Sequence, residues 1–189
     1  MQSYVPRSNI RDRFGMQGKR RVILTVSRLD PVKRVDLLIR AFDALKRAHA
    51  DAVLVIVGIG PDEGRLKTLV AELGTRDITF TGLVPDQDLW DYYATSDVFV
   101  TPAWADFNIA PFEALALGCR VVWSSEMETE EALEKSGAVT TADPSVPAFA
   151  EAIARTLDTP PPTRWDITPY LWSTRYARLA SLYTSIIQR

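Results

Sequence analysis

The cations that follow the first predicted strand have the types and spacing that bind phosphate. Residues 27–34 read Ser-Arg-Leu-Asp-Pro-Val-Lys-Arg, which places Arg28 and Lys33 just before a helical pattern. A helix N-terminus favours anions through its free amide hydrogens and its dipole. Arg28 would contact two phosphate oxygens, and Lys33 would act as a point charge. The alternative is a solvated basic loop, and spacing alone leaves both interpretations open.

A second loop, residues 102–118, brings a carboxylate to the start of another predicted helix. Backbone amides at the entrance of that helix suit phosphate. Glu113 lies about one turn into an otherwise apolar stretch, where a buried carboxylate must be hydrogen-bonded. One use is to accept hydrogen bonds from two neighbouring ribose hydroxyls. The alternative is a Glu that faces solvent or caps nearby backbone.

Two other features receive structural interpretations. The glycines at 58, 60 and 64 miss the G-x-G-x-x-G pattern, because three residues separate Gly60 from Gly64. Tight turning and helix initiation explain them, with at most a supporting role near a phosphate. His49, the single histidine, is predicted to be a helix-terminal cation or a surface residue rather than a catalytic base. No cluster of His, Cys and carboxylates has metal-ligand spacing, so no metal site is expected.

A parallel sheet is the framework that would gather these loops. Short β-branched runs at 21–27, 52–57, 78–81, 97–101, 120–123 and 138–141 alternate with segments of helical spacing. Strands that are apolar on both faces and separated by helices predict an α/β fold with a doubly wound, Rossmann-like parallel sheet of six strands. Ligands bind beyond the carboxyl ends of such strands, and this rule selects the loops described above.

The rest of the chain fits a single domain over residues 1–189. We expect an entry segment at 1–20, the core at 21–158 and a Pro-rich connector at 159–169, where three consecutive prolines form a stiff extended run. The apolar spacing of residues 170–189 predicts an extra C-terminal helix that closes the domain.

Composition excludes several classes of protein. A hydrophobic fraction of 47% and a net charge of −2 with both signs interspersed indicate an ordinary globular protein without a nucleic-acid-binding surface. The single Cys119 cannot form an intrachain disulfide, so a cytoplasmic location is the expectation. No apolar run approaches the roughly 20 residues that span a bilayer, and no secretory signal is predicted.

Several segments resemble one family in order along the chain. Residues 27–42, Val-Ile-Val-Gly-Ile-Gly-Pro at 55–61, Ile-Thr-Phe-Thr-Gly-Leu-Val at 78–84, Asp-Val-Phe-Val-Thr-Pro at 97–102 and Pro-Phe-Glu-Ala-Leu-Ala-Leu-Gly at 111–118 resemble the C-terminal domain of group 1, glycogen-synthase-like retaining glycosyltransferases. Tyr-Leu-Trp at 170–172 is similar to the start of that family's closing helix. The resemblance covers about residues 20 to 187.

This resemblance implies one half of a two-domain GT-B enzyme that binds a nucleotide diphosphate sugar, either a UDP-sugar or a GDP-sugar. Arg28 and Lys33 match the family's diphosphate-contacting cations, and the amides of Asn108 and Ile109 match its phosphate-binding segment. Glu113 matches the ribose-binding glutamate. The segment Gly82, Leu83 and Val84 would lie near the base. The family generally needs neither a metal nor another cofactor, because the cations and amides neutralise the leaving diphosphate.

The chain also departs from the family pattern. Ala105 stands where the first of two paired glutamates would face the transferred sugar, and the adjacent Asp106 is the one catalytic candidate. The N-terminal acceptor domain is absent from the sequence, and any peripheral membrane association would come through that domain. Two functions follow: the donor half of an enzyme that transfers a hexose to a glycan or lipid-linked acceptor, or a degenerate module that binds nucleotide or protein without transfer.

Overall fold

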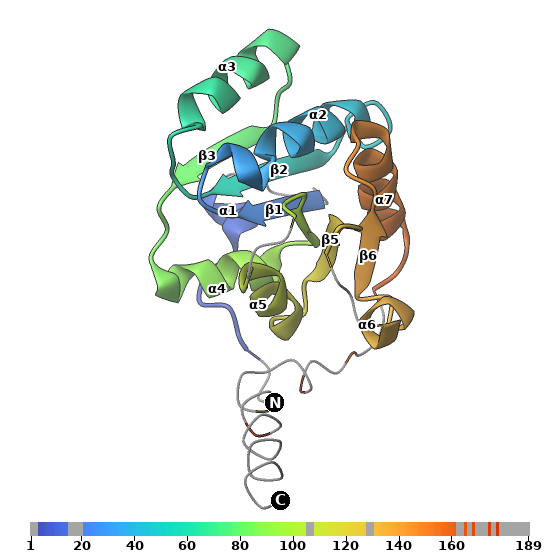
Figure 1. Ribbon diagram of the computed structural model, residues 1–189. Helices are drawn as coiled ribbons and strands as arrows, with labels where there is room; N and C mark the ends of the chain where they lie inside the picture. The colour runs from blue at the N-terminus through green and yellow to red at the C-terminus, as the bar shows by residue number, and fades with distance from the viewer. Residues whose placement is uncertain are drawn as a thin grey trace, which may run out of the picture.

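A computed structural model of the chain describes residues 4–14, 21–104, 108–127 and 131–161, together with Trp165, Thr168, Thr174 and Ala177. Its sheet has six parallel strands: β1 (Arg21–Val26), β2 (Ala52–Val57), β3 (Ile78–Gly82), β4 (Val98–Thr101), β5 (Arg120–Ser124) and β6 (Val139–Ala142). The strand order is β3-β2-β1-β4-β5-β6, the order of a doubly wound sheet (Figure 1). The fold class predicted from the sequence is confirmed.

Helices cover both faces of the sheet. The described helices are α1 (Ile10–Arg13), α2 (Val35–Leu45), α3 (Glu63–Leu73), α4 (Asp86–Thr95), α5 (Ala110–Ala116), α6 (Glu131–Lys135) and α7 (Val146–Asp158), with the 3-10 turn η1 (Pro31–Lys33) ahead of α2. Side chains of α2, α3 and α7 pack on one face, and side chains of α1, α4, α5 and α6 pack on the other.

Alternation along each strand explains this double cover. In β2 all six residues are buried, with Leu54 and Ile56 packed under α2 and α3, while Val53 and Val55 pack under α4. Branched apolar side chains fill both faces of such a strand, as in parallel sheets generally. Gly74, which directly follows the apolar helical pattern, adopts the left-handed conformation that ends α3.

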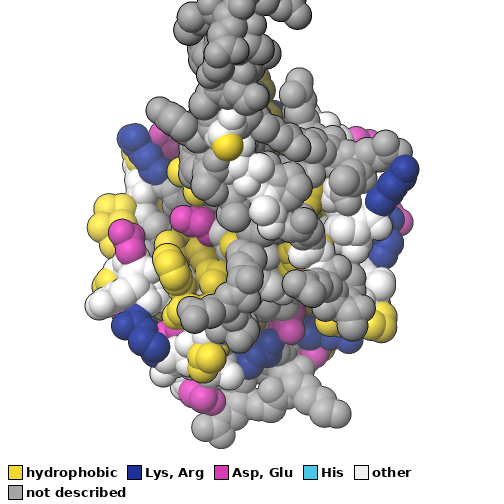
Figure 2. Space-filling view, turned by 90° about the horizontal axis from the view of Figure 1, so that it is seen from below, with side chains coloured by type: hydrophobic (Ala, Val, Ile, Leu, Met, Phe, Trp, Pro, Cys, Tyr) yellow, Lys and Arg dark blue, Asp and Glu magenta, His cyan; other side chains and the backbone are white. Residues whose placement is uncertain are grey.

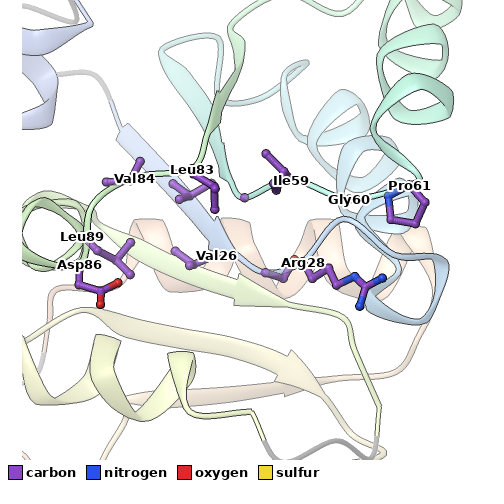
Figure 3. A pocket seen from close by; sticks show the side chains of 12 residues that line it. Val26, Arg28, Ile59, Gly60, Pro61, Leu83, Val84, Asp86 and Leu89 are labelled. Atoms are coloured by element: carbon purple, nitrogen blue, oxygen red, sulfur yellow. The ribbon is translucent and has the colours of Figure 1, made fainter.

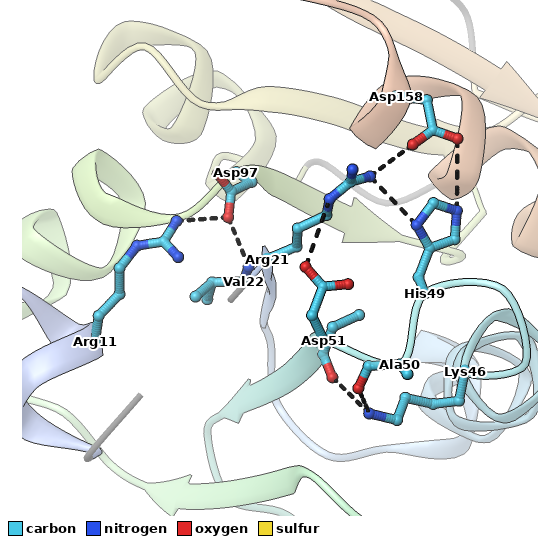
Figure 4. A network of polar contacts seen from close by, with 10 residues as sticks. Arg11, Arg21, Val22, Lys46, His49, Ala50, Asp51, Asp97 and Asp158 are labelled. Atoms are coloured by element: carbon cyan, nitrogen blue, oxygen red, sulfur yellow. Dashed lines mark hydrogen bonds and ion pairs between the residues drawn. The ribbon is translucent and has the colours of Figure 1, made fainter. Parts of the chain in front are cut away.

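The N-terminal edge of the sheet carries a polar network (Figure 4). Arg21, the first residue of β1, pairs with the Asp158 carboxylate at 2.7 Å and lies 3.2 Å from His49 Nδ1. His49 is only 8% exposed, so of the two predicted roles, helix-terminal cation or surface residue, the second is wrong. The sequence did not show that the start of β1 and the end of α7 meet over it.

The described part of the entry segment, residues 4–14, is hydrogen-bonded to α4. Asp91, 2% exposed, accepts hydrogen bonds from the Tyr4 hydroxyl at 2.5 Å, the Arg7 amide at 2.9 Å, and both the amide and the hydroxyl of Ser8. Ile10 follows as a fully buried residue. Of the expected closing helix, the structure describes only Thr174 and Ala177, both helical.

Candidate functional site

The strand order creates one point where successive connections leave the sheet in opposite directions. β1 lies between β2 and β4, so the loop after β1 runs toward one half of the sheet and the loop after β4 toward the other. A crevice forms at such a switch point beyond the carboxyl ends of the strands. The loops after β1, β2, β3 and β4 therefore define the candidate site.

The loop after β1 has an anchored backbone and an outward-pointing cation. Leu29 is fully buried and its amide donates to the carbonyl of Ile59 at 2.9 Å, while Ser27 donates to Val57 at 3.1 Å. The Arg28 side chain is 71% exposed, and within the described part of the chain the carboxylate that pairs with it, Asp30, is 3.8 Å away. An exposed pair at that distance is weak, so the guanidinium is available to an anion.

The glycines of the loop after β2 are required by close approach to this anchored backbone. A Cβ added to Gly58 would meet the Ser27 carbonyl oxygen at 1.9 Å, and one added to Gly60 would meet that of Leu29 at 2.0 Å. A Cβ on Gly64 would meet nothing within 4 Å. The first two glycines thus let two loops touch, which is more specific than the turn formation that the sequence suggested.

A cavity of about 580 Å³ opens over the ends of β1, β2 and β3 (Figure 3). Apolar side chains Leu83, Val84 and Leu89 form one end, and Arg28 and the Gly58–Pro61 loop form the other. The Ser27 hydroxyl lines it and has no hydrogen-bond partner among the described residues. The cavity combines an apolar end, a cation and an unpaired hydroxyl, which suits a ligand with a flat apolar part and an anionic part.

Asp86 also lines this cavity, at the first turn of α4. Sequence reasoning missed Ser27, Ile59, Asp86 and Leu89 as lining residues. Ile59 lies inside a loop that the strand-end rule selects, whereas Leu89 is on the following helix and only the position of α4 against the cavity reveals it.

In the segment Gly82–Val84, which was predicted to lie near the base, the glycine contributes backbone contacts and the other two residues contribute side chains. Gly82 adopts a positive φ of 70° and its carbonyl accepts from the Gly58 amide at 2.9 Å, which joins the loops after β2 and β3. Leu83 is 73% exposed and Val84 is partly buried against the α4 side of the core. The two side chains line the cavity, and Gly82 sets the course of the backbone.

Glu113 is held by a buried tyrosine. The Tyr93 hydroxyl donates to Glu113 Oε2 at 3.0 Å, and Tyr93 itself is fully buried on α4. Burial, and then the neighbouring Glu113 carboxylate, raises the pKa of Tyr93 far above its usual range. Tyr93 therefore remains a neutral donor at all physiological pH values, and it fixes one carboxylate oxygen while the half-buried Glu113 keeps further acceptor capacity.

The start of α5 is organised by Asn108. Its side-chain oxygen accepts from the Ala110 amide at 3.3 Å, and its amide group lies 3.4 Å from the Thr101 hydroxyl at the end of β4. Ile109 is 47% exposed at the N-cap position. Ala105 and Asp106, and with them the catalytic candidate, lie outside the described residues.

The structure does not gather all predicted site residues around one cavity. Arg28, Leu83 and Val84 line it, whereas Lys33, Asn108, Ile109 and Glu113 belong to the neighbouring loops at the switch point. Cys119 is fully packed and burial raises the pKa of its thiol well above the usual range, which makes it a core residue. The described residues contain no group of His, Cys, Asp or Glu arranged to hold a metal ion.

The surface and the helices add two observations. On the face shown in Figure 2, Lys and Arg side chains are mixed with Asp and Glu around the periphery and form no single basic patch. Within the described part of the chain, no helix has the length and apolar character to span a membrane.

Comparison with known proteins decides the family. The model of the family "Glycosyl transferases group 1" matches residues 6–170. The chain belongs to the group 1 glycosyl transferases. One curated relative is the GDP-mannose-dependent alpha-(1-6)-phosphatidylinositol monomannoside mannosyltransferase of Mycolicibacterium smegmatis, 33% identical over 93% of this chain and 50% of the relative. The chain spans about half of that protein's length.

Solved structures show the same fold. Sucrose-phosphate synthase from Thermosynechococcus elongatus matches 99% of this chain and 50% of its own with a TM-score of 0.78 at 22% identity. The C-terminal domain of a group 1 glycosyl transferase from Francisella tularensis matches 84% of this chain and 87% of its own with a TM-score of 0.68 at 19% identity. The group 1 family and the GT-B type of fold that the sequence suggested are confirmed.

Proposed function

We propose that this group 1 domain binds the nucleotide diphosphate sugar of a retaining glycosyltransferase. The observation that carries the proposal is the cavity over β1, β2 and β3, with its apolar end at Leu83 and Val84 and its cation, Arg28, at the other end. A nucleotide has this polarity, a flat base at one end and a charged phosphate at the other. The volume of about 580 Å³ lies within the range of small-molecule sites.

The roles of the residues follow from their chemistry. The base packs against Leu83 and Val84, and the ribose hydroxyls donate to Glu113, whose carboxylate Tyr93 holds from the far side. Arg28, Lys33 and the amides of Asn108 and Ile109 contact the diphosphate at the start of α5. As the sugar leaves, negative charge grows on the diphosphate, and preorganised cations and amides lower the barrier by stabilising it.

Asp86 favours a GDP-sugar over a UDP-sugar. Guanine presents two adjacent donors, N1–H and the N2 amino group, which a carboxylate accepts as a pair. Uracil presents one N–H between two carbonyl oxygens, which would face the Asp86 carboxylate with like partial charge. The mycobacterial relative is named as GDP-mannose-dependent, which supports the same donor.

Transfer itself belongs to a longer enzyme. The curated relatives are about twice as long as this chain, which supports an N-terminal acceptor domain that provides the other wall of the cleft. We propose that the whole enzyme transfers a hexose to a glycan or lipid-linked acceptor, with the chain arranged as the single domain, connector and closing helix predicted above, and that Asp106 is its candidate carboxylate at the sugar. The substitution at Ala105 favours a second function, a module that binds nucleotide without transfer.

Calorimetric titration of the chain with GDP, UDP and guanosine tests the binding proposal. Arg28→Ala should weaken GDP binding about tenfold, the loss of one charge-assisted hydrogen bond, and leave guanosine binding unchanged. The matched control is Arg76→Ala. Arg76 is an exposed arginine just before β3, at the N-terminal ends of the strands and away from the candidate site. If neither nucleotide binds, or if Arg28→Ala behaves like the control, the donor-site assignment is wrong.

Two further variants separate the remaining claims. Asp86→Asn should lower the preference for GDP over UDP without changing the phosphate contribution. Ala105→Glu, in the enzyme joined to its N-terminal domain, should raise sugar transfer if the missing carboxylate limits the reaction. Unchanged transfer in that variant, with nucleotide binding intact, would favour the non-catalytic module.

A further inference from the structure

Arg34 combines an unusual backbone with an ion pair that no pattern in the sequence indicates. It adopts φ 50° and ψ 38°, the left-handed conformation that favours glycine, at the junction of η1 and α2. Its guanidinium pairs through Nη1 with Glu126, and Nη2 lies 3.5 Å from the other carboxylate oxygen. Both side chains are partly exposed, at 28% and 37%.

Stability does not account for Arg34. A partly exposed ion pair adds little to folding, and a left-handed backbone at a residue with a Cβ costs more than such a pair returns. The left-handed backbone itself ends η1, since the Arg34 amide donates to the Pro31 carbonyl at 3.0 Å, and the Arg34 carbonyl accepts from the Leu37 amide at the start of α2. A glycine would make the same backbone contacts without strain, and the Arg34 side chain adds no capping hydrogen bond. A strained residue where a glycine would serve points to a function for its side chain.

The topology places the pair at the switch point. Arg34 belongs to the loop after β1, and Glu126 lies two residues beyond the end of β5. Because β4 lies between β1 and β5 in the sheet, a pair that joins these two loops spans the position where β4 ends. That is the crevice to which the fold assigns the ligand, next to Lys33 in the sequence.

Glu126 is held in place independently of Arg34. Its carboxylate accepts from the Ser124 hydroxyl at 3.0 Å, and its own amide donates to that hydroxyl at 3.2 Å. Ser124 is fully buried at the end of β5. The hydrogen bond from Arg34 outweighs the effect of burial and, with the hydrogen bond from Ser124, holds the pKa of Glu126 below its usual range, so the carboxylate is charged near pH 7.

We propose that Arg34 is a further phosphate-binding residue, and that its guanidinium exchanges the Glu126 carboxylate for the diphosphate of the donor. This inference rests on the proposed donor site and adds to it a third cation and a competing anion. Glu126 holds the guanidinium over the crevice in the unliganded domain, and the diphosphate, with more charge and more acceptor oxygens, replaces it. The carboxylate then keeps the hydrogen bond that it accepts from the Ser124 hydroxyl.

The exchange predicts opposite effects for the two partners. Arg34→Gly removes the cation and relieves the left-handed backbone, so it should bind GDP about tenfold more weakly while its melting temperature stays equal or rises. Glu126→Gln removes the competing charge at constant shape and should bind GDP about threefold more tightly. Guanosine, which has no phosphate, should bind all three proteins equally.

Calorimetry with GDP and guanosine on the wild-type chain and on both variants measures these changes, and thermal unfolding checks folding. Wild-type affinity for GDP in Arg34→Gly would overturn the proposal, and so would weaker binding in Glu126→Gln, which would make Glu126 a positioning residue for Arg34 rather than a competitor. The variant Arg28→Ala distinguishes a failure of this inference from a failure of the proposed donor site. If it weakens GDP binding while Arg34→Gly does not, the donor site is right and this inference is wrong; if the wild type binds no GDP, both are wrong.

Discussion

The contact between the loops after β1 and β2 gives the sharpest test of the site's architecture, through the substitution Gly58→Ala. The new Cβ would lie 1.9 Å from the Ser27 carbonyl oxygen, a backbone atom that cannot rotate away. Real Cβ atoms stay at least 3.0 Å from such an atom, so the two loops must separate by about 1 Å. The φ of 130° at Gly58 adds backbone strain for any other residue.

These two effects each cost roughly 1–3 kcal/mol, so Gly58→Ala should lower the free energy of unfolding by about 2–6 kcal/mol. For a domain of this size the melting temperature should fall by roughly 10 °C. Gly64→Ala is the matched control in the same loop region: its Cβ has open space in the first turn of α3, and the better helix propensity of Ala should stabilise by about 0.5 kcal/mol.

Urea unfolding of the two variants, followed by circular dichroism, measures both changes. The two Gly-to-Ala changes, six residues apart, should change the free energy of unfolding in opposite directions. A Gly58→Ala protein with the wild-type midpoint and unaltered nucleotide binding would show that the loops do not touch as described. Destabilisation by Gly64→Ala to the same extent would show that general loss of glycine flexibility, rather than the contact with Ser27, is responsible.

Two other changes probe the buried polar groups. Tyr93→Phe removes the donor that fixes Glu113, so it should lower the free energy of unfolding by about 1–2 kcal/mol and weaken binding of GDP more than that of 2′,3′-dideoxy-GDP, as measured by calorimetry. Burial raises the pKa of Asp91, but hydrogen bonds from Tyr4, Arg7 and Ser8 outweigh it and leave the pKa below the usual range. The stability contributed by this carboxylate is therefore full above about pH 4, the unfolded value, and is lost as the pH falls from there through the lowered pKa. Urea unfolding between pH 5 and 2 should show a flatter decline for Asp91→Asn than for the wild type, and parallel declines would contradict this account.

The sequence predicted the elements of the fold because each carries its own local signal. The run of branched apolar residues at 52–57 fills two faces of a sheet, and the glycine after Leu73 ends a helix, whatever surrounds them. The strand-end rule then selected the loops of the candidate site from the sequence alone. Arg28, Leu83 and Val84 are on the cavity because they directly follow strands.

What the sequence could not predict depends on contacts between distant segments. Arg34 and Glu126 are 92 residues apart, and nothing in either segment indicates the other. His49 looked like a surface residue because its neighbours are alanines, yet the ends of β1 and α7 meet over it. Gly58 suggested only a turn, because a side chain at this position is excluded by the carbonyl of Ser27, which lies in the loop after β1.

The two edges of the sheet use charge differently. At the N-terminal ends of the strands, cations lie close to carboxylates. Arg21 is 2.7 Å from Asp158 (Figure 4), and Lys46 is 2.9 Å from Asp77. Beyond the carboxyl ends of the strands the cations differ from one another. Arg34 pairs closely with Glu126, whose carboxylate also accepts from the Ser124 hydroxyl, whereas the Arg28 side chain is 71% exposed and lies 3.8 Å from Asp30. An exposed pair at that distance is weak, so Arg28 can bind an anion without breaking a close ion pair, while Arg34 must exchange one anion for another. This difference supports a donor diphosphate that Arg28 contacts at the carboxyl ends of the strands.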